Sequence, residues 1–81
     1  MAGADDLKRV VDLALAGDWD GAHAIAQRDT SDVLFCWLHA CLHKIEGDRS
    51  NSRYWYARAG RRFDAFADPQ AELQAIRAAL S

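Results

Sequence analysis

Residues 32–46 constrain the fold of this chain more than any other segment. They form its longest run that reads as a helix without a breaking residue. Apolar side chains occupy nearly every side of that helix, and a helix of this kind is a buried one. The run is too short, and too interrupted by His and Lys, to span a bilayer, which takes about 20 apolar residues. We therefore predict a central helix with the other helices packed around it.

A narrow polar stripe remains on this central helix. Its members follow one another at intervals of four, three, four and three residues, which places them on one side of the helix. We expect any chemistry of the protein to lie near them. They are Asp32, Cys36, His39, His43 and Glu46.

The composition is typical of one globular domain, residues 1–81. The chain is 51% hydrophobic and 27% charged, has one proline, and lacks the alternation of apolar and polar residues that marks strands. We predict an all-α fold. The net charge of −2 argues against a general binder of nucleic acid or of anionic membranes.

Charge is spread unevenly along the chain. Residues 1–32 hold seven acids and three bases, a net charge of −4, whereas residues 47–63 hold one acid and five bases, a net charge of +4. The favoured interpretation is a pair of solvated, charged faces that keep the domain soluble. The alternative is that these complementary regions steer a partner or a second copy of the chain.

The two cysteines, Cys36 and Cys41, lie on the central helix. Five residues apart on one helix, they point in different directions and cannot form a disulfide with each other. Two reduced, buried thiols fit a cytosolic protein. The first six residues lack the basic and apolar regions of a signal peptide. We therefore expect a cytoplasmic location.

Glycine and aspartate divide the chain into helices. We predict helices over residues 5–16, 18–27, 32–46, 49–59 and 69–80, with Thr30 or Ser31 as the cap of the central helix. Gly17-Asp18 and Gly47-Asp48 repeat the same stop and start signal thirty residues apart. This repeat predicts two antiparallel helical hairpins.

The rest of the chain follows the second predicted hairpin. We expect residues 61–67 to form an irregular link whose Phe63 and Phe66 fold back onto the core. Residues 69–80 begin with Asp68-Pro69, a strong helix start. We expect this helix to cap the exposed side of the second hairpin, and to face inward with Leu73, Ile76, Ala79 and Leu80.

The second hairpin resembles a tetratricopeptide repeat. Cys36, His39, Ala40 and His43 fall at the spacing of the repeat's first helix, and Ser52, Tyr56 and Ala59 fall at that of its second. Residues 54–60 also resemble the end of a Sel1-type repeat. About half of the chain is similar to small bacterial helical proteins without an assigned activity. His39 and His43 stand where the tetratricopeptide family prefers Leu and Tyr.

This resemblance implies a helical repeat that binds a protein or peptide and is not an enzyme. We expect a protein partner or a second copy of the chain, and no nucleic acid, membrane or cofactor. No catalytic residue is predicted. We interpret the aromatic and arginine side chains of residues 53–58 as core packing beside a solvated arginine face. The next alternative is a groove for a peptide or protein, and the least favoured is stacking with nucleic-acid bases. The candidate contact residues are His39, His43, Arg53, Tyr54 and Arg58.

The main alternative is a metal- or small-ligand-binding helical protein. His39 and His43, one turn apart, can share a divalent cation, and Glu46 can join them. His23 or Cys36 is a possible further ligand. Against this we expect the histidines to pack between helices and to hydrogen-bond to Tyr, Asp or backbone groups. A third hypothesis is a small enzyme that uses His and Tyr.

Overall fold

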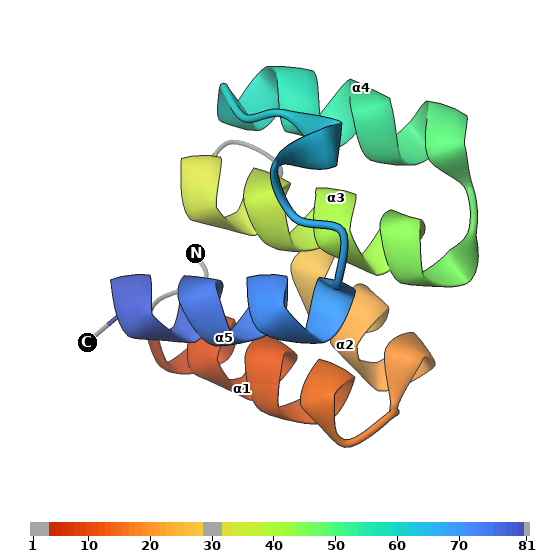
Figure 1. Ribbon diagram of the computed structural model, residues 1–81. Coiled ribbons are helices and arrows are strands. Elements are labelled where there is room, and N and C mark those ends of the chain that lie inside the picture. Colours follow the sequence, from red (N-terminus) through yellow and green to blue (C-terminus); the bar gives the residue numbers. More distant parts are fainter. Residues whose placement is uncertain (1–3, 29–31, 81) are drawn as a thin grey trace.

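The computed structural model describes residues 4–28 and 32–80, and this part of the chain is almost entirely helical (Figure 1). No strand occurs among the described residues, so the predicted all-α class is confirmed. Five α-helices and one short 3₁₀ helix follow one another in this part of the chain. They are α1 (Ala4–Leu15), α2 (Trp19–Ala26), α3 (Val33–Glu46), α4 (Arg49–Ala59), η1 (Phe63–Ala65) and α5 (Pro69–Ala79).

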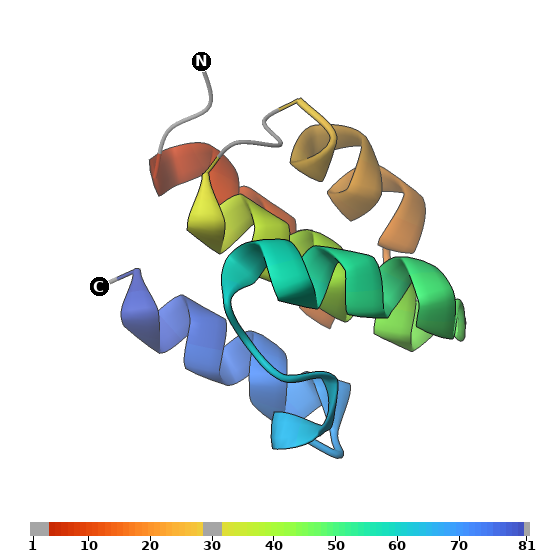
Figure 2. The ribbon, with the colours of Figure 1, turned by 90° about the horizontal axis from the view of Figure 1, so that it is seen from above.

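Helix α3 lies at the centre of the fold, as the apolar character of residues 32–46 predicts. It contacts α1, α2, α4 and α5, and residues 35–43 are buried without interruption. Two views at right angles show the other helices placed around it (Figure 1, Figure 2). No helix in the described ranges combines the length and the apolar composition that crossing a membrane requires.

One predicted member of the polar stripe on α3, Asp32, has a different role in the structure. Asp32 is not part of the helical face. It is the N-cap, and its carboxylate accepts hydrogen bonds from the amides of Leu34 at 2.8 Å and Phe35 at 3.4 Å. A carboxylate here satisfies amides that have no partner within the helix. Thr30 and Ser31, the caps expected from the sequence, lie outside the described residues.

The two Gly-Asp signals have the same backbone geometry. Gly17 and Gly47 each have a φ of 89°, in the left-handed region that favours glycine. The amides of Asp18 and Asp48 then bond back to the carbonyls of Leu13 and His43, as expected for a Schellman motif. The carboxylates of Asp18 and Asp48 in turn cap α2 and α4. Each pair therefore ends one helix and starts the next.

These turns set the neighbours of α3. Helices α1 and α2 pack along each other, as do α3 and α4, and in both pairs the chain direction reverses (Figure 1, Figure 2). Helix α2 also contacts α3. That contact brings His23 on α2 to the side of α3 that carries His39.

Helix α5 packs against both halves of the chain. It contacts α3, one helix of the expected second hairpin, and equally α1, where Arg77 forms an ion pair with Asp12. Leu73 and Ile76 are fully buried, as predicted, whereas Ala79 is exposed. Ala79 is exposed because it is the last residue of α5 and lies beyond the part of that helix that packs against α1 and α3.

The link before α5 is more ordered than the irregular segment that the sequence predicts, because it contains the short helix η1. Phe63 and Phe66 are partly buried and pack against the core, as predicted. The ammonium of Lys44 lies 5.0 Å from the centre of the Phe63 ring and donates to the carbonyl of Phe66 at 3.0 Å. The link therefore folds back over α3.

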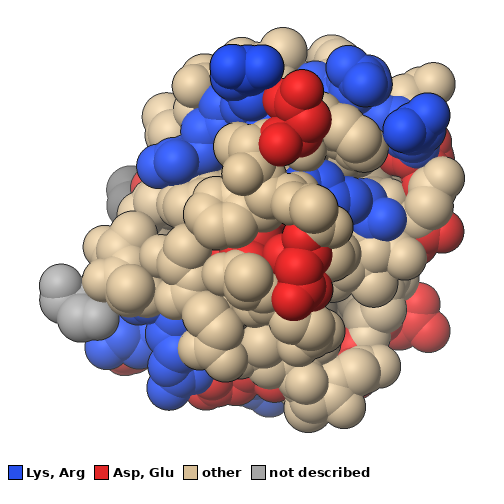
Figure 3. All heavy atoms as spheres, viewed as in Figure 1, with Lys and Arg blue, Asp and Glu red and all other residues tan. Residues whose placement is uncertain are grey.

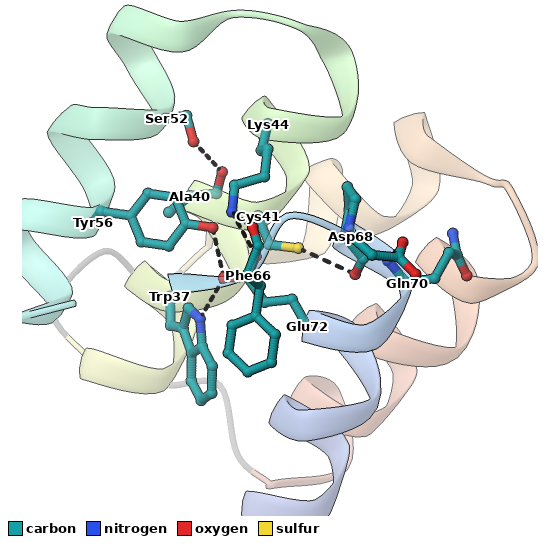
Figure 4. Close-up of polar contacts among 11 residues, drawn as sticks. Trp37, Ala40, Cys41, Lys44, Ser52, Tyr56, Phe66, Asp68, Gln70 and Glu72 are labelled. Carbon is teal, nitrogen blue, oxygen red and sulfur yellow. Dashed lines mark hydrogen bonds and ion pairs between the residues drawn. The ribbon is translucent and has the colours of Figure 1, made fainter. Parts of the chain in front are cut away.

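A buried carboxylate joins three helices (Figure 4). Glu72 of α5 is 1% exposed and accepts hydrogen bonds from Trp37 at 2.8 Å and from the Tyr56 hydroxyl at 2.5 Å. Its other oxygen receives the ammonium of Lys44 at 2.8 Å. A buried charge is tolerated only when it is paired and hydrogen-bonded in this way. Glu72 thereby fixes α5 against α3 and α4.

Candidate metal site formed by three histidines

The three histidines of the chain all meet at one place. His23 comes from α2, while His39 and His43 lie one turn apart on α3. The Nε2 atoms of His23 and His39 are 3.2 Å apart. One ring nitrogen from each of the three lies within 4.8 Å of the other two. We call these residues the histidine cluster.

Tryptophan rings hold two members of the histidine cluster in place. The ring of Trp19 stacks on His23 with 4.5 Å between centroids, and its indole N–H donates to the carbonyl of Leu42 at 2.6 Å. The ring of Trp55, from α4, stacks on His39 with 4.0 Å between centroids and 8° between planes. Three helices therefore fix the orientation of the rings.

Glu46 lies at the outer edge of the histidine cluster. Its carboxylate is 2.8 Å from Nδ1 of His43, and its ligand atoms group with those of His43 and Asp48. The residue whose ring nitrogen lies beside those of both His39 and His43 is His23. Helical spacing alone does not show this, because the partner comes from another helix.

Other expected ligands and partners are arranged differently. Cys36 is not among the described groups whose ligand atoms come together, although Asp48 lies near His43 and Glu46. Asp48 is already engaged as the cap of α4 through Asn51. The histidines do pack between helices, as expected. Within residues 4–28 and 32–80, the side chains of His23 and His39 are hydrogen-bonded to each other and that of His43 to Glu46, rather than to Tyr, Asp or backbone groups.

Burial favours the uncharged state of His23 and His39. It is the main cause that lowers the pKa of His39 from 6.5 to about 4, with further lowering by the charges of His43 and His23. Burial and then His43 also lower the pKa of His23, against smaller opposing effects of Glu46 and Asp20. At neutral pH, His23 and His39 are therefore neutral, and neutral imidazole is the form that binds metals.

The candidate contact residues divide into two groups. His39, Trp55, Arg58 and Tyr54 form a continuous row, because the Arg58 guanidinium lies 5.4 Å from the Trp55 ring and donates to the Tyr54 hydroxyl at 3.2 Å. Arg53 lies apart from this row, over the ring of Phe63 at 4.6 Å.

Several residues that organise the fold and the histidine cluster are not evident from the sequence. His23 is predicted only as an optional further ligand, as Cys36 is, and Trp19 and Glu72 are given no part in a site. The signal available was weak: His23 lies four residues after Trp19, a spacing that allows their rings to stack on one helix.

No protein-family model, no curated protein and no solved structure matches the chain. The function therefore has to be argued from the geometry and chemistry of the residues themselves.

Proposed function

We propose that this protein binds a divalent transition metal ion, Zn²⁺ in the first place, through His23, His39 and His43. The observation that carries the proposal is that all three histidines of the chain present ring nitrogens within 4.8 Å of one another. Two nitrogens bound to one tetrahedral zinc are about 3.3–3.4 Å apart. The 3.2 Å between His23 and His39 is close to that spacing.

The surroundings of the histidine cluster support this proposal. Imidazole nitrogens suit Zn²⁺, Cu²⁺ and Ni²⁺. The carboxylate of Glu46 on Nδ1 of His43 leaves the other ring nitrogen of His43 for the metal and orients the ring, the arrangement common behind zinc-binding histidines. Three protein ligands leave a fourth position for water or another ligand.

Packing alone explains the histidine cluster less well. His39 is 5% exposed, and its Nδ1 has no hydrogen-bond partner among the described residues. A buried histidine kept only for packing normally has both ring nitrogens satisfied. Leu, the residue of the tetratricopeptide pattern, would fill a core position without this cost.

The test is native mass spectrometry of untagged protein purified without chelator, followed by calorimetric titration with Zn²⁺ at neutral pH. We expect one Zn²⁺ per chain, no binding of Mg²⁺, and loss of Zn²⁺ binding in His23→Gln. Partly buried His23 is the variant of choice because its change disturbs the core least. Arg58→Gln, on the neighbouring surface, is the matched control, and circular dichroism checks that both variants fold.

A second variant measures how much the Glu46 carboxylate contributes to Zn²⁺ affinity. Glu46→Gln should weaken Zn²⁺ binding by about 10–100-fold, the usual effect of removing a partner behind a metal ligand. The proposal is wrong if the wild type takes up no Zn²⁺, or if folded His23→Gln binds it as tightly as the wild type.

A second candidate function, a protein- or peptide-binding module, is favoured by the row that ends at Tyr54. Tyr54 is 54% exposed and is held by Arg58, and Tyr and Arg are frequent at the energetic centres of interfaces. The resemblance to helical repeats supports the same function. If a second copy of the chain is the partner, sedimentation velocity should detect a dimer that Tyr54→Ala disrupts while Zn²⁺ binding is retained. A strictly monomeric wild type would exclude self-association.

A further inference from the structure

Two aromatic rings that are not part of the histidine cluster lie against arginine side chains. The guanidinium of Arg53 lies 4.6 Å from the centre of the Phe63 ring, and that of Arg61 lies 3.5 Å from the centre of the Trp37 ring. Such cation–π contacts restrain a long side chain without using its N–H donors. Both guanidinium groups are thus positioned while their donors stay available.

These arginines border a hollow of about 370 Å³, which we call the arginine hollow. Its volume is within the range of small-ligand sites. Figure 3 shows Lys and Arg side chains gathered over α4 and the segment that follows it. The residues that line the hollow are Arg53, Tyr56, Ala57, Arg61, Arg62, Phe63 and Asp64.

The arginine hollow carries an excess of positive charge. Three guanidinium groups face one carboxylate, a net of two positive charges. Asp64 pairs with Arg62 at 3.4 Å, and both side chains are largely exposed. Within the described part of the chain, no carboxylate pairs with Arg53 or Arg61. These two are therefore the groups left to receive an anion.

We propose that the arginine hollow binds the phosphate group of a small phosphate monoester. A guanidinium presents its donors as a planar fork that matches the oxygens of phosphate. Two excess positive charges balance a phosphate monoester, which is close to a dianion at neutral pH. This site lies apart from the histidine cluster and does not depend on the metal proposal.

A second, neighbouring hollow indicates which kind of group the phosphate of the ligand is attached to. It measures about 190 Å³ and shares Arg61 and Arg62 with the arginine hollow; its other lining residues are Trp37, Gly60, Ala65, Phe66 and Glu72. The Glu72 carboxylate is already engaged by Trp37, Tyr56 and Lys44, so the remaining lining is largely apolar. An apolar or aromatic group next to the phosphate would fit there. Phenyl phosphate, which joins the two parts, is therefore the probe of choice.

The experiment is titration of isotope-labelled protein with phenyl phosphate at low ionic strength, followed by amide chemical shifts. We expect saturable shifts around residues 53–66, weaker binding of inorganic phosphate and none of phenol. Arg53→Gln and Arg61→Gln should each weaken binding about tenfold, as expected for loss of a charge-assisted hydrogen bond. Arg9→Gln, on α1, is the matched control. All three side chains are exposed, so the variants should fold, which circular dichroism checks.

Several results would overturn the proposal. One is the absence of saturable shifts with phenyl phosphate, and another is equal affinity of Arg53→Gln and Arg9→Gln. Tighter binding of benzoate would assign the hollow to carboxylates instead. Binding of single-stranded oligonucleotides but not of phenyl phosphate would indicate a nucleic-acid surface. His23→Gln, which lacks the metal site, should bind phenyl phosphate like the wild type, so the two proposals fail separately.

Discussion

The ring of Trp55 lies flat against the ring of His39, with 4.0 Å between centroids and 8° between planes. His39 belongs to α3 and Trp55 to α4, so the contact ties the histidine cluster to the helix that carries Tyr54 and Arg58. It covers the His39 imidazole on one face while His23 approaches its edge. A ring enclosed in this way is costly to charge, which leads to the first prediction.

Stability of the metal-free protein should fall as the pH falls through the window from 6.5 to about 4. The unfolded chain takes up a proton on His39 near pH 6.5, whereas burial holds the pKa of folded His39 at about 4. Below pH 6.5 the unfolded state therefore binds more protons, and the free energy of unfolding drops by up to roughly 3 kcal/mol for this residue. Above pH 6.5 this contribution is fully present. The measurement is urea unfolding at a series of pH values.

His39→Leu isolates this effect, because leucine does not titrate. Carboxylates also change protonation in acid, so both proteins lose stability at low pH, but the wild type should lose more between pH 6.5 and 4. Parallel pH profiles of the two proteins would contradict the prediction.

Glu72→Gln should destabilise the fold by about 3–5 kcal/mol, because it leaves the largely buried ammonium of Lys44 without its carboxylate. Chemical denaturation measures this loss. Glu46→Gln makes the same change at an exposed position of α3. It is the control, and its loss of stability should be much smaller. The double variant Lys44→Met with Glu72→Gln removes the unpaired charge and should recover part of the stability. A single variant as stable as the control would contradict the structural role of Glu72.

Trp37→Ala and Tyr56→Ala should each cost about 3–5 kcal/mol through the cavities they leave. Both side chains are at most 3% exposed, and both donate to Glu72. Tyr56→Phe keeps the ring and removes only the hydroxyl, so it should cost less, about 1–3 kcal/mol. Thermal unfolding measures the three variants. Unchanged midpoints for both alanine variants would contradict this packing.

The cysteines should resist a thiol reagent in the folded protein. Both are buried, and burial, together with the neighbouring charge of Glu72, raises the pKa of Cys41 well above its usual value. The thiolate is the reactive form, so labelling should require unfolding and accelerate with urea. Cys36→Ser assigns the rate to Cys41 alone. Rapid labelling of this variant in native buffer would show that α3 is more accessible than its burial indicates.

Much of the helical architecture could be predicted from the sequence. The central helix, the Gly-Asp turns and the Asp68-Pro69 start are encoded by side chains that act within one turn of the backbone. Asp32 shows the limit of this local reasoning. Its spacing fits the polar stripe as well as the cap position, and only the backbone at the start of α3 shows that it caps the helix.

The candidate sites depended on contacts between distant segments. The spacing of His39 and His43 follows from the helix period, and it identified two of the three histidines. His23 is sixteen residues from His39, and Glu72 is thirty-five from Trp37. Helical periodicity cannot predict such pairs, because they form only when whole helices pack.

The sequence by itself determined most of the α-helix boundaries and which helix is buried, because caps, breakers and apolar periodicity are properties of neighbouring residues. Only the tertiary structure decided that α5 packs on α1 as well as α3, that Glu72 is a paired buried charge, and that every histidine meets at one point. The physical reason is that burial and pairing depend on which surfaces come together in space. A polar side chain shows its role only once its neighbours from other helices are in place.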